Sequence, residues 1–431
     1  MSFNLSEQQD EAVFKIREWY ADPDRKQVFW LAGLAGTGKS YLIAPIIDAL
    51  GIDPSQIALV GPTAMAAKVV RQKLEKAGLV ADTSTIHSAI YQVKPLKAEV
   101  LEAALQSAQT DLGRDPGNKV LAAKVRMIET NLDRAYDLND VQFRLNPDST
   151  VTNCRLIIVD ESSMVGKLIA DDLRAFGIPI LAIGDHGQLQ PVEDDPGLCI
   201  GKPDYALTEI HRQAADNPII LYAHLLRQGE QMPFGDYGPL KIIRPRQDDY
   251  TLDPARTAQV ICGMNKTRWD LTASLRRLNG FEGPTPQHGE PLIICRNSRT
   301  IPSLINGAHC KSLEDHADLT SGRGYFSMKL QDEQGAAHRI KAYQGIFEEH
   351  LERVKGASSL AALSKKANFQ ARKVSHHVDF GWVMTCHKAQ GSGWPSVIVH
   401  DEGAVFREEV WNWRYTAATR AENELIVIRR D

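Results

Sequence analysis

The residues best suited to chemistry lie near the N-terminus, in a glycine-rich stretch that fits the phosphate-loop pattern of Gly, four residues, then Gly-Lys-Ser. The candidate nucleotide ligands there are Gly33, Ala35, Gly36, Thr37, Gly38, Lys39 and Ser40. Glycines let backbone N–H groups close around a polyphosphate, and the dipole of a following helix favours its negative charge. Lys39 would reach the outer phosphates, and the Ser40 hydroxyl would ligate Mg²⁺. The stretch therefore predicts a nucleoside triphosphate site.

The elements that must position this loop are visible on both sides of it. An apolar run at residues 28–32 predicts a buried strand, and residues 41–50 predict the helix behind the loop, with Pro45 in its first turns. Upstream, Ser6 and Gln9 have the spacing of a capping box at the start of another helix. Gln8 is either an adenine-edge ligand or a residue of the helix surface, and the sequence leaves both interpretations open.

Two further strands end in side chains that complete a phosphoryl-transfer site. Asp160 and Glu161 follow the apolar run 155–159, where Asp160 can hold Mg²⁺ through water and Glu161 can polarise the attacking water. Gln188 follows a strand at 178–183 and is placed to sense the γ-phosphate and signal its presence to a neighbouring domain. These positions predict an NTP-hydrolysing site rather than a glycine-rich turn.

Composition sets broad limits. The chain has 431 residues, 43% of them hydrophobic and 24% charged, with a net charge of −4, as expected for two to four globular domains without a global basic field. Its six cysteines are scattered, which is typical of reduced core thiols in an intracellular protein. No run predicts a membrane span or a signal peptide. The adjacent His376 and His377 lack partners at metal-ligand spacing and favour a surface pair.

The rest of the chain divides into sheet segments and inserts. Residues 96–136 predict a helical hairpin, and residues 141–145 with 150–152 predict a small β-hairpin that closes this first insert. A second sheet is expected from residue 259, and short strands between 291 and 343 predict a compact β module inserted into it.

The ordered motifs resemble those of the superfamily-one helicases, and most of all the B-type branch of Dda and RecD. The matching elements are Gln8, the stretch 33–40, Gly61-Pro62-Thr63, Thr85 with His87, Asp160-Glu161, Gly184-Asp185 with Gln188, Arg212, the stretch 385–392 and the stretch 415–420. The resemblance implies an α/β fold with two RecA-like P-loop cores built on parallel sheets, each carrying an insert. It implies core 1A at 1–90 and 151–200, insert 1B at 91–150, core 2A at 201–290 and 366–431, and a Src-homology-3-like, β-barrel-like insert 2B at 291–365.

The resemblance also implies roles for individual residues. Arg212 and Arg420 match two arginines that reach the γ-phosphate, with Lys39, Glu161 and Gln188 completing the catalytic set. The implied DNA contacts are Pro62, Thr63, Thr85, His87, Thr385, His387 and Lys388. Insert 1B looks larger and more helical than the simple pin of Dda-like enzymes, and Phe143 is the candidate wedge between separating strands.

By resemblance, the protein is an ATP-dependent DNA helicase that moves 5′→3′ on single-stranded DNA, uses ATP and Mg²⁺, and opens forked duplexes as a monomer. A bacterial or phage-infected cytoplasm is the expected location, with a single-stranded-DNA-binding or replisome protein as a candidate partner and no membrane contact. A translocase that never separates strands remains an alternative. A P-loop nucleotide switch and a small-molecule kinase are others, although Asn265-Lys266-Thr267-Arg268 lacks the Asp of a guanine signature.

Overall fold

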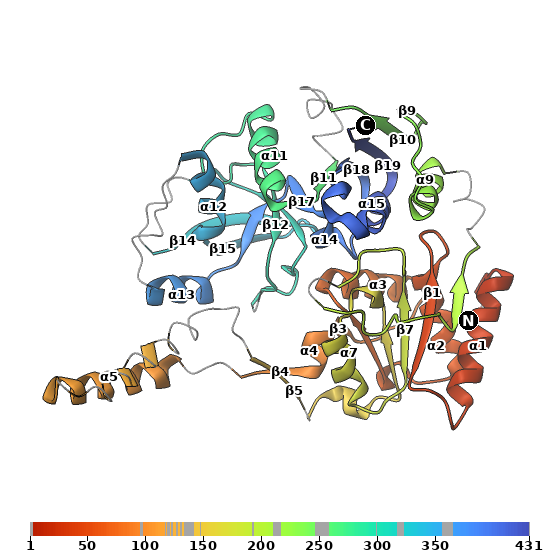
Figure 1. The fold of residues 1–431 in the computed structure, drawn as a ribbon, viewed down its shortest axis with the longest axis horizontal. Helices are drawn as coiled ribbons and strands as arrows, with labels where there is room; N and C mark the ends of the chain where they lie inside the picture. The colour runs from red at the N-terminus through yellow and green to blue at the C-terminus, as the bar shows by residue number, and fades with distance from the viewer. Residues whose placement is uncertain are drawn as a thin grey trace.

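The computed structural model describes residues 3–94, 98–116, 118, 121, 124–125, 128–129, 132, 142–146, 148–191, 194–209, 217–245, 258–298, 300–316, 323–355 and 365–430. Figure 1 shows two sheet-based halves, one above the other, with an extended arm leaving the lower half. Two six-stranded sheets, one five-stranded sheet and one two-stranded sheet make up the described β-structure. No helix in these ranges combines the length and apolar character needed to cross a bilayer.

Core 1A is a parallel sheet in the order β3-β2-β6-β7-β1-β8. Its strands are β1 (Val28–Gly33), β2 (Ile57–Gly61), β3 (Thr83–Thr85), β6 (Leu156–Val159), β7 (Ile180–Gly184) and β8 (Tyr205–Leu207). Its helices are α1 (Glu7–Ala21), η1 (Lys39–Leu42), α2 (Ile43–Leu50), η2 (Pro54–Gln56), α3 (Ala64–Lys76), α4 (Ile86–Ile90), η3 (Thr150–Asn153), η4 (Ser162–Met164) and α7 (Lys167–Arg174). β6 and β7 are buried along their whole length, as expected for parallel strands covered on both faces.

The boundary expected at residue 200 falls one strand too early. β8 pairs in parallel with β1, so the 1A sheet continues at least to Leu207. The apolar run 205–207 is too short to signal its sheet, and only the pairing assigns it.

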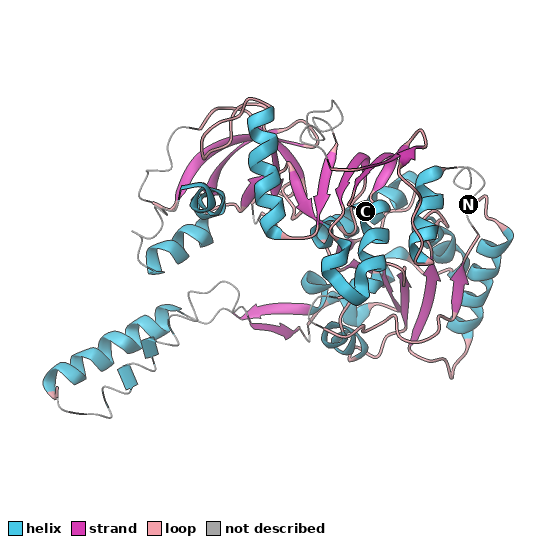
Figure 2. Cartoon of the chain, turned by 45° about the horizontal axis from the view of Figure 1, so that its top comes forward, coloured by secondary structure: helices cyan, strands magenta, loops and turns pink. Residues whose placement is uncertain are grey.

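Insert 1B is an arm that projects from core 1A (Figure 2). β4 (Tyr91–Lys94) pairs antiparallel with β5 (Gln142–Leu145), and α5 (Ala98–Arg114) lies beyond them. The expected hairpin between 141–145 and 150–152 is therefore wrong. Ser149 instead accepts a hydrogen bond from Val151 N and donates one to Ala89 O at 2.6 Å, which folds residues 150–153 into a 3₁₀ turn. Most of the expected second helix of the arm lies outside the described residues.

Core 2A is a second sheet in the order β17-β11-β18-β19-β10-β9, parallel except for its β9–β10 edge. Its strands are β9 (Gly235–Asp236), β10 (Leu240–Ile243), β11 (Gln259–Cys262), β17 (Val383–Thr385), β18 (Trp394–His400) and β19 (Ala421–Ile428). Its helices are α9 (Pro218–Arg227), α11 (Asn265–Leu278), α14 (Cys386–Ala389), η6 (Gly403–Glu409) and α15 (Val410–Ala418). The described residues thus contain two mainly parallel six-stranded sheets, as the resemblance implies.

Insert 2B is an antiparallel sheet in the order β15-β14-β13-β12-β16. Its elements are β12 (Pro291–Ile294), β13 (His309–Ser312), β14 (Tyr325–Asp332), β15 (Ala337–Tyr343), α12 (Gln344–Lys355), α13 (Lys365–Val374) and β16 (Val378–Phe380). A bridge between Ala342 and His376 brings the two edges of the sheet together. Because β16 pairs with β12, the insert extends to Phe380, past the expected end at 365.

Candidate nucleotide site between the two cores

The phosphate loop connects β1 to η1 and requires its glycines for two different reasons. Gly36 and Gly38 have φ values of 81° and 79°, in the left-handed region that glycine enters without strain. A Cβ on Gly33 would lie 2.6 Å from Lys39 Cγ, so a side chain there would displace the lysine. The helix expected behind the loop begins as the 3₁₀ turn η1 and becomes α-helical at Ile43.

Lys39 is folded back into its own loop. Its ammonium donates to the carbonyl oxygens of Gly33 at 2.7 Å and Leu34 at 2.9 Å, and it lies 3.5 Å from the Asp185 carboxylate. These oxygens bind the Lys39 ammonium, for which the outer phosphates of a nucleotide would compete. Lys39 must therefore leave the two carbonyls when a polyphosphate binds.

The two carboxylates after β6 are set apart from solvent. Asp160 is buried, and this burial, followed by the charge of Glu161, raises its pKa to about 6. Glu161 has a positive φ of 53°, which is strained for a residue with a side chain, and its Oε2 is buried without a hydrogen-bond partner among the described residues. Two carboxylates held in this way fit a divalent cation at Asp160 and a polar ligand at Glu161.

Gln188 lies on a loop of core 1A that core 2A also holds. Asn412 donates to the carbonyls of Gly187 and Gln188 at 3.1 and 3.2 Å. The Thr416 hydroxyl accepts from Leu189 N at 2.9 Å. The Gln188 side chain is buried, yet its Oε1 has no partner among the described residues. The loop is therefore fixed to core 2A through its backbone, while its amide side chain remains available to a ligand.

A cavity of about 1010 Å³ joins Lys39, Glu161 and Gln188 across the boundary between the cores, and Asp160 is not among its lining residues. Among the residues that line it are Ala35, Gly36, Gly38, Lys39, Ser40, Lys73, Glu161 and Gln188 from core 1A and Thr419 and Arg420 from core 2A. Arg420 is buried and held by Thr416 O at 3.1 Å, Ser392 O at 3.0 Å and Thr419 Oγ1 at 3.1 Å. The guanidinium of one core thus lines the same cavity as the lysine and the acid of the other.

Tyr415 belongs to the stretch 415–420, but the sequence predicted no role for it. Its hydroxyl accepts from Ala35 N in the phosphate loop at 2.8 Å and donates to Asp185 Oδ2 at 2.6 Å. Burial and then the Asp185 carboxylate raise the pKa of Tyr415 well above its usual value. Although burial opposes it, Lys39 and then the Tyr415 hydroxyl keep the pKa of Asp185 below its usual value. The one sequence signal for a role of Tyr415 was its position five residues before Arg420.

Gln8 does not line this cavity. Its Oε1 accepts from Thr208 N at 2.9 Å and Glu209 N at 2.8 Å, and its Nε2 donates to Thr208 Oγ1 at 3.0 Å. The neighbouring Gln9 is buried and donates to Thr37 O in the phosphate loop at 3.1 Å. In this structure, Gln9 rather than Gln8 contacts the loop.

The expected DNA residues of core 1A lie at helix starts. Thr63 follows Pro62 after β2 and caps α3 by accepting from Ala66 N at 3.1 Å. Thr85 caps α4 and contacts the Ser88 hydroxyl at 2.8 Å. His87 lies on α4 with its ring 5.3 Å from that of Tyr91, and burial lowers its pKa.

The expected DNA residues of core 2A surround α14. The Thr385 side chain does not cap this helix, in contrast to Thr63 and Thr85. The His387 ring lies 5.6 Å from that of Phe406, and burial lowers its pKa. Lys388 donates to Cys295 Sγ at 3.1 Å. Arg212 and the Phe143 side chain lie outside the described residues, although Phe143 belongs to β5.

The chain matches two protein-family models. Residues 4–238, more than half of the chain, match a protein-family model described as an AAA domain. The chain belongs to this AAA-domain family. Residues 380–428 match a second model, described as a UvrD-like helicase C-terminal domain.

The relatives are helicases. The chain is 44% identical over 279 residues to the ATP-dependent RecD2 DNA helicase of Deinococcus radiodurans, an alignment that covers 62% of this chain and 35% of that protein. The chain thus matches about a third of the length of this relative. The Pif1 helicase of Candida albicans superposes with a TM-score of 0.54 at 18% identity, covering 100% of this chain and 95% of that one. Bacteroides Pif1 bound to single-stranded DNA gives 0.51 at 14% identity with the same coverage. The resemblance to the superfamily-one B-type helicases and the fold of two RecA-like cores are confirmed.

Proposed function

We propose that this protein is an ATP-dependent DNA helicase that translocates 5′→3′ on single-stranded DNA and separates strands at a fork. The observation that carries the proposal is the shared cavity, where Arg420 of core 2A lines the same space as Lys39 and Glu161 of core 1A. A hydrolysis site divided between two bodies works only when they close on each other. Each turnover therefore moves one core relative to the other.

In this proposal, ATP binds with its phosphates against the loop 33–40. Lys39 exchanges the carbonyls of Gly33 and Leu34 for the outer phosphates, and Glu161 orients the attacking water and takes its proton. Arg420 stabilises the charge that develops as the γ-phosphoryl group is transferred, with Arg212 in the same role. Gln188 donates a hydrogen bond from its amide nitrogen to the γ-phosphate, whose oxygens accept.

Mg²⁺ fits this site through the Ser40 hydroxyl and the buried Asp160 carboxylate. When bound, it neutralises phosphate charge during transfer. Burial and the charge of Glu161 raise the pKa of Asp160 to about 6. A cation next to this carboxyl would favour its ionised form.

Single-stranded DNA crosses both cores in this proposal, over Pro62, Thr63, Thr85 and His87 of core 1A and Thr385, His387 and Lys388 of core 2A. Contacts to phosphates and stacked bases give little sequence preference. Phe143 remains the candidate wedge. The protein would act as a monomer in a bacterial or phage-infected cytoplasm, with a single-stranded-DNA-binding or replisome protein as a candidate partner.

The test measures ATP hydrolysis with and without single-stranded DNA, together with unwinding of forks that carry either a 5′ or a 3′ tail. Strong stimulation by DNA and unwinding from the 5′ tail are expected, and Lys39→Ala abolishes both while the protein keeps its circular dichroism spectrum. ATPase activity that ignores DNA would instead favour a nucleotide switch or small-molecule kinase. Stimulation without unwinding would favour a translocase, and unwinding only from a 3′ tail would reverse the polarity.

A further inference from the structure

Insert 2B contains a second cavity that shares no lining residue with the nucleotide site. Most side chains that line this second cavity are cationic or polar. It encloses about 240 Å³ and is lined by Arg296, Asn297, Ser298, Thr300, Lys373, Val374, Ser375, His376 and His377. No acidic residue is among them. Arg296 and Arg372 are close enough to His377 to help lower its pKa, after burial. We refer to this space as the basic cavity.

One buried ring nitrogen of the basic cavity has no hydrogen-bond partner in the part of the chain that the structure describes. The Ser298 hydroxyl oxygen accepts from Thr300 N at 3.2 Å and Ile301 N at 3.0 Å, and it lies 2.9 Å from His376 Nε2. The serine oxygen already accepts two hydrogen bonds, and Nε2 at 2.9 Å is nearer to it than Thr300 Oγ1 at 3.5 Å. We therefore assign the serine proton to Nε2, which places the proton of the neutral ring at Nδ1. The His376 Nδ1 atom is buried without a partner among the described residues. A buried N–H donor beside cationic side chains suits an anion, whereas the same charges repel a metal ion.

The size of the basic cavity limits the anion. Its volume is below the about 300–1,000 Å³ that drug-sized ligands occupy. The space therefore suits one phosphate group with part of its substituents rather than a whole nucleotide.

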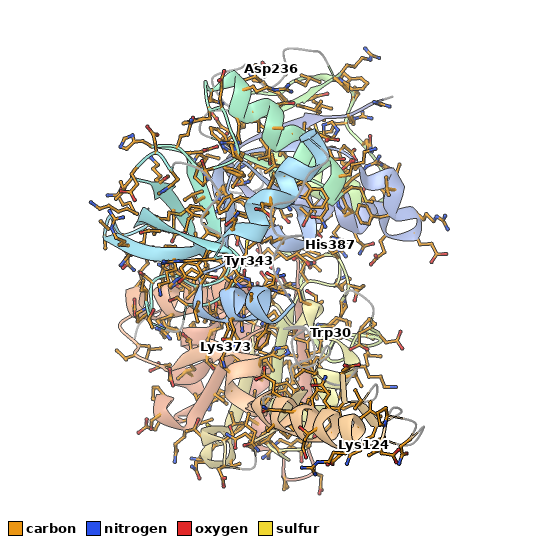
Figure 3. All side chains as sticks on the ribbon, turned by 90° about the vertical axis from the view of Figure 1, so that its left-hand side faces the viewer. Trp30, Lys124, Asp236, Tyr343, Lys373 and His387 are labelled. Atoms are coloured by element: carbon orange, nitrogen blue, oxygen red, sulfur yellow. The ribbon has the colours of Figure 1, made fainter. Side chains whose placement is uncertain are left out.

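Position indicates where this phosphate comes from. Asn297 also lines a groove of about 580 Å³ between core 1A and insert 2B, whose other lining residues include Thr85, Ser88 and Ser303. Thr85 is one of the DNA residues expected on core 1A. In Figures 1 and 2, α13 forms the edge of insert 2B that faces insert 1B, and Figure 3 shows Lys373 on this helix at the level where the two halves of the molecule meet.

We propose that the basic cavity binds one backbone phosphate of the single strand that passes Thr85 in the adjoining groove, extending the DNA track from core 1A onto insert 2B. This inference rests on the proposed function. Lys373 and Arg296 supply the charge, and His376 supplies an uncharged hydrogen-bond donor. No base is read there, so the contact adds affinity for any sequence.

The test is the salt dependence of oligo(dT) binding by the full chain, measured by fluorescence anisotropy between about 50 and 200 mM salt. Each phosphate neutralised on a single strand contributes about −0.7 to the slope of log K against log salt. Lys373→Ala is expected to reduce the steepness of this slope by about 0.7 for an oligomer of ~16 nucleotides, and by nothing for one of ~6 nucleotides that fills only the cores. Lys373→Arg is expected to restore the slope.

Lys329→Ala is the matched control, because Lys329 is an exposed lysine of the same insert on β14. Its slope is expected to equal that of the parent, and the unfolding temperatures of all variants check the fold. An unchanged slope in Lys373→Ala with the long oligomer overturns the proposed site while leaving the helicase proposal intact. Failure of the parent protein to bind oligo(dT) overturns the proposed function instead. Inorganic phosphate that raises the unfolding temperature of the parent but not of Lys373→Ala, with equal salt slopes for the two proteins on the long oligomer, would show a free-phosphate site and refute the strand contact.

Discussion

Replacing Arg420 by alanine tests the division of the site between the two cores. Arg420 lines the nucleotide cavity from core 2A and is held in place by three hydrogen bonds, to Thr416 O, Ser392 O and Thr419 Oγ1. Its guanidinium is therefore oriented before the phosphoryl transfer begins. Groups of this kind, supplied to a transferring phosphoryl group, are worth about 10³–10⁵ in turnover.

We expect Arg420→Ala to lower the DNA-stimulated kcat by about 10³-fold, which corresponds to about 4 kcal/mol of transition-state stabilisation. Binding of ATP changes much less, because Lys39 and the phosphate loop on core 1A remain. The fold loses about 1–3 kcal/mol, because the Ser392 carbonyl loses the guanidinium that it accepts from, whereas Thr416 O still accepts from Thr419 Oγ1. Arg420→Lys keeps the charge without the fork geometry and is expected to recover only part of the rate.

The assay combines steady-state phosphate release at saturating single-stranded DNA with the affinity of a fluorescent ATP analogue. Arg277→Ala is the control, since Arg277 is an exposed arginine at the end of α11 on the same core. A kcat for Arg420→Ala within a few-fold of that of the Arg277 variant would refute the reasoning. An equally large loss of nucleotide affinity would also contradict it, because the arginine would then bind the ground state.

Tyr415→Phe removes the hydroxyl that joins core 2A to Asp185 and to the phosphate loop, and because one of its two bonds is to a buried carboxylate we expect a loss of about 1.5–3 kcal/mol in the nucleotide-free protein. Thermal unfolding without nucleotide measures this loss, and an unchanged unfolding temperature would mean that the cores do not depend on the contact. Burial and the Glu161 charge raise the pKa of Asp160 to about 6. As the pH falls through about 6, this carboxyl therefore gains a proton in the folded state, and we expect the Mg²⁺ concentration for half-maximal ATPase activity to rise. The raised pKa also means that ionised Asp160 costs stability above about pH 6, and Mg²⁺ titrations and unfolding curves between about pH 7.5 and pH 5.5 check both effects.

The parts of the fold that sequence could predict are those with a local physical signature. The phosphate loop, with its flanking strand and helix, is specified by glycines and by an apolar run, and the structure contains both. The acids at 160–161 follow a strand that is buried throughout, which a continuous apolar run predicts well. Each of these elements can be predicted from its own residues and their immediate neighbours.

The remainder depends on pairing partners that are distant in sequence. β5 pairs with β4 rather than with the nearer segment 150–152, and β8 and β16 join sheets beyond the expected domain boundaries. The residues of a short strand do not indicate which sheet the strand joins, so only the tertiary structure identifies its pairing partner. The same limit applies to Tyr415, whose function follows from reaching Ala35 and Asp185 across the boundary between the cores. Gln8 and Gln9 differ by one helical position, and the rotation of α1 alone determines which one contacts the phosphate loop.

Under the proposed function, the loop at 187–189 is the link between the γ-phosphate and core 2A. By chain connectivity the loop belongs to core 1A, because it follows β7. By hydrogen bonding it belongs equally to core 2A, since Asn412, Thr416 and Gln390 hold the backbone of residues 187–189. Only the Gln188 side chain is left for a ligand. Under the proposed function, a phosphate that draws this amide toward Lys39 moves a segment already attached to core 2A, and no separate relay element is required between the chemistry and the movement.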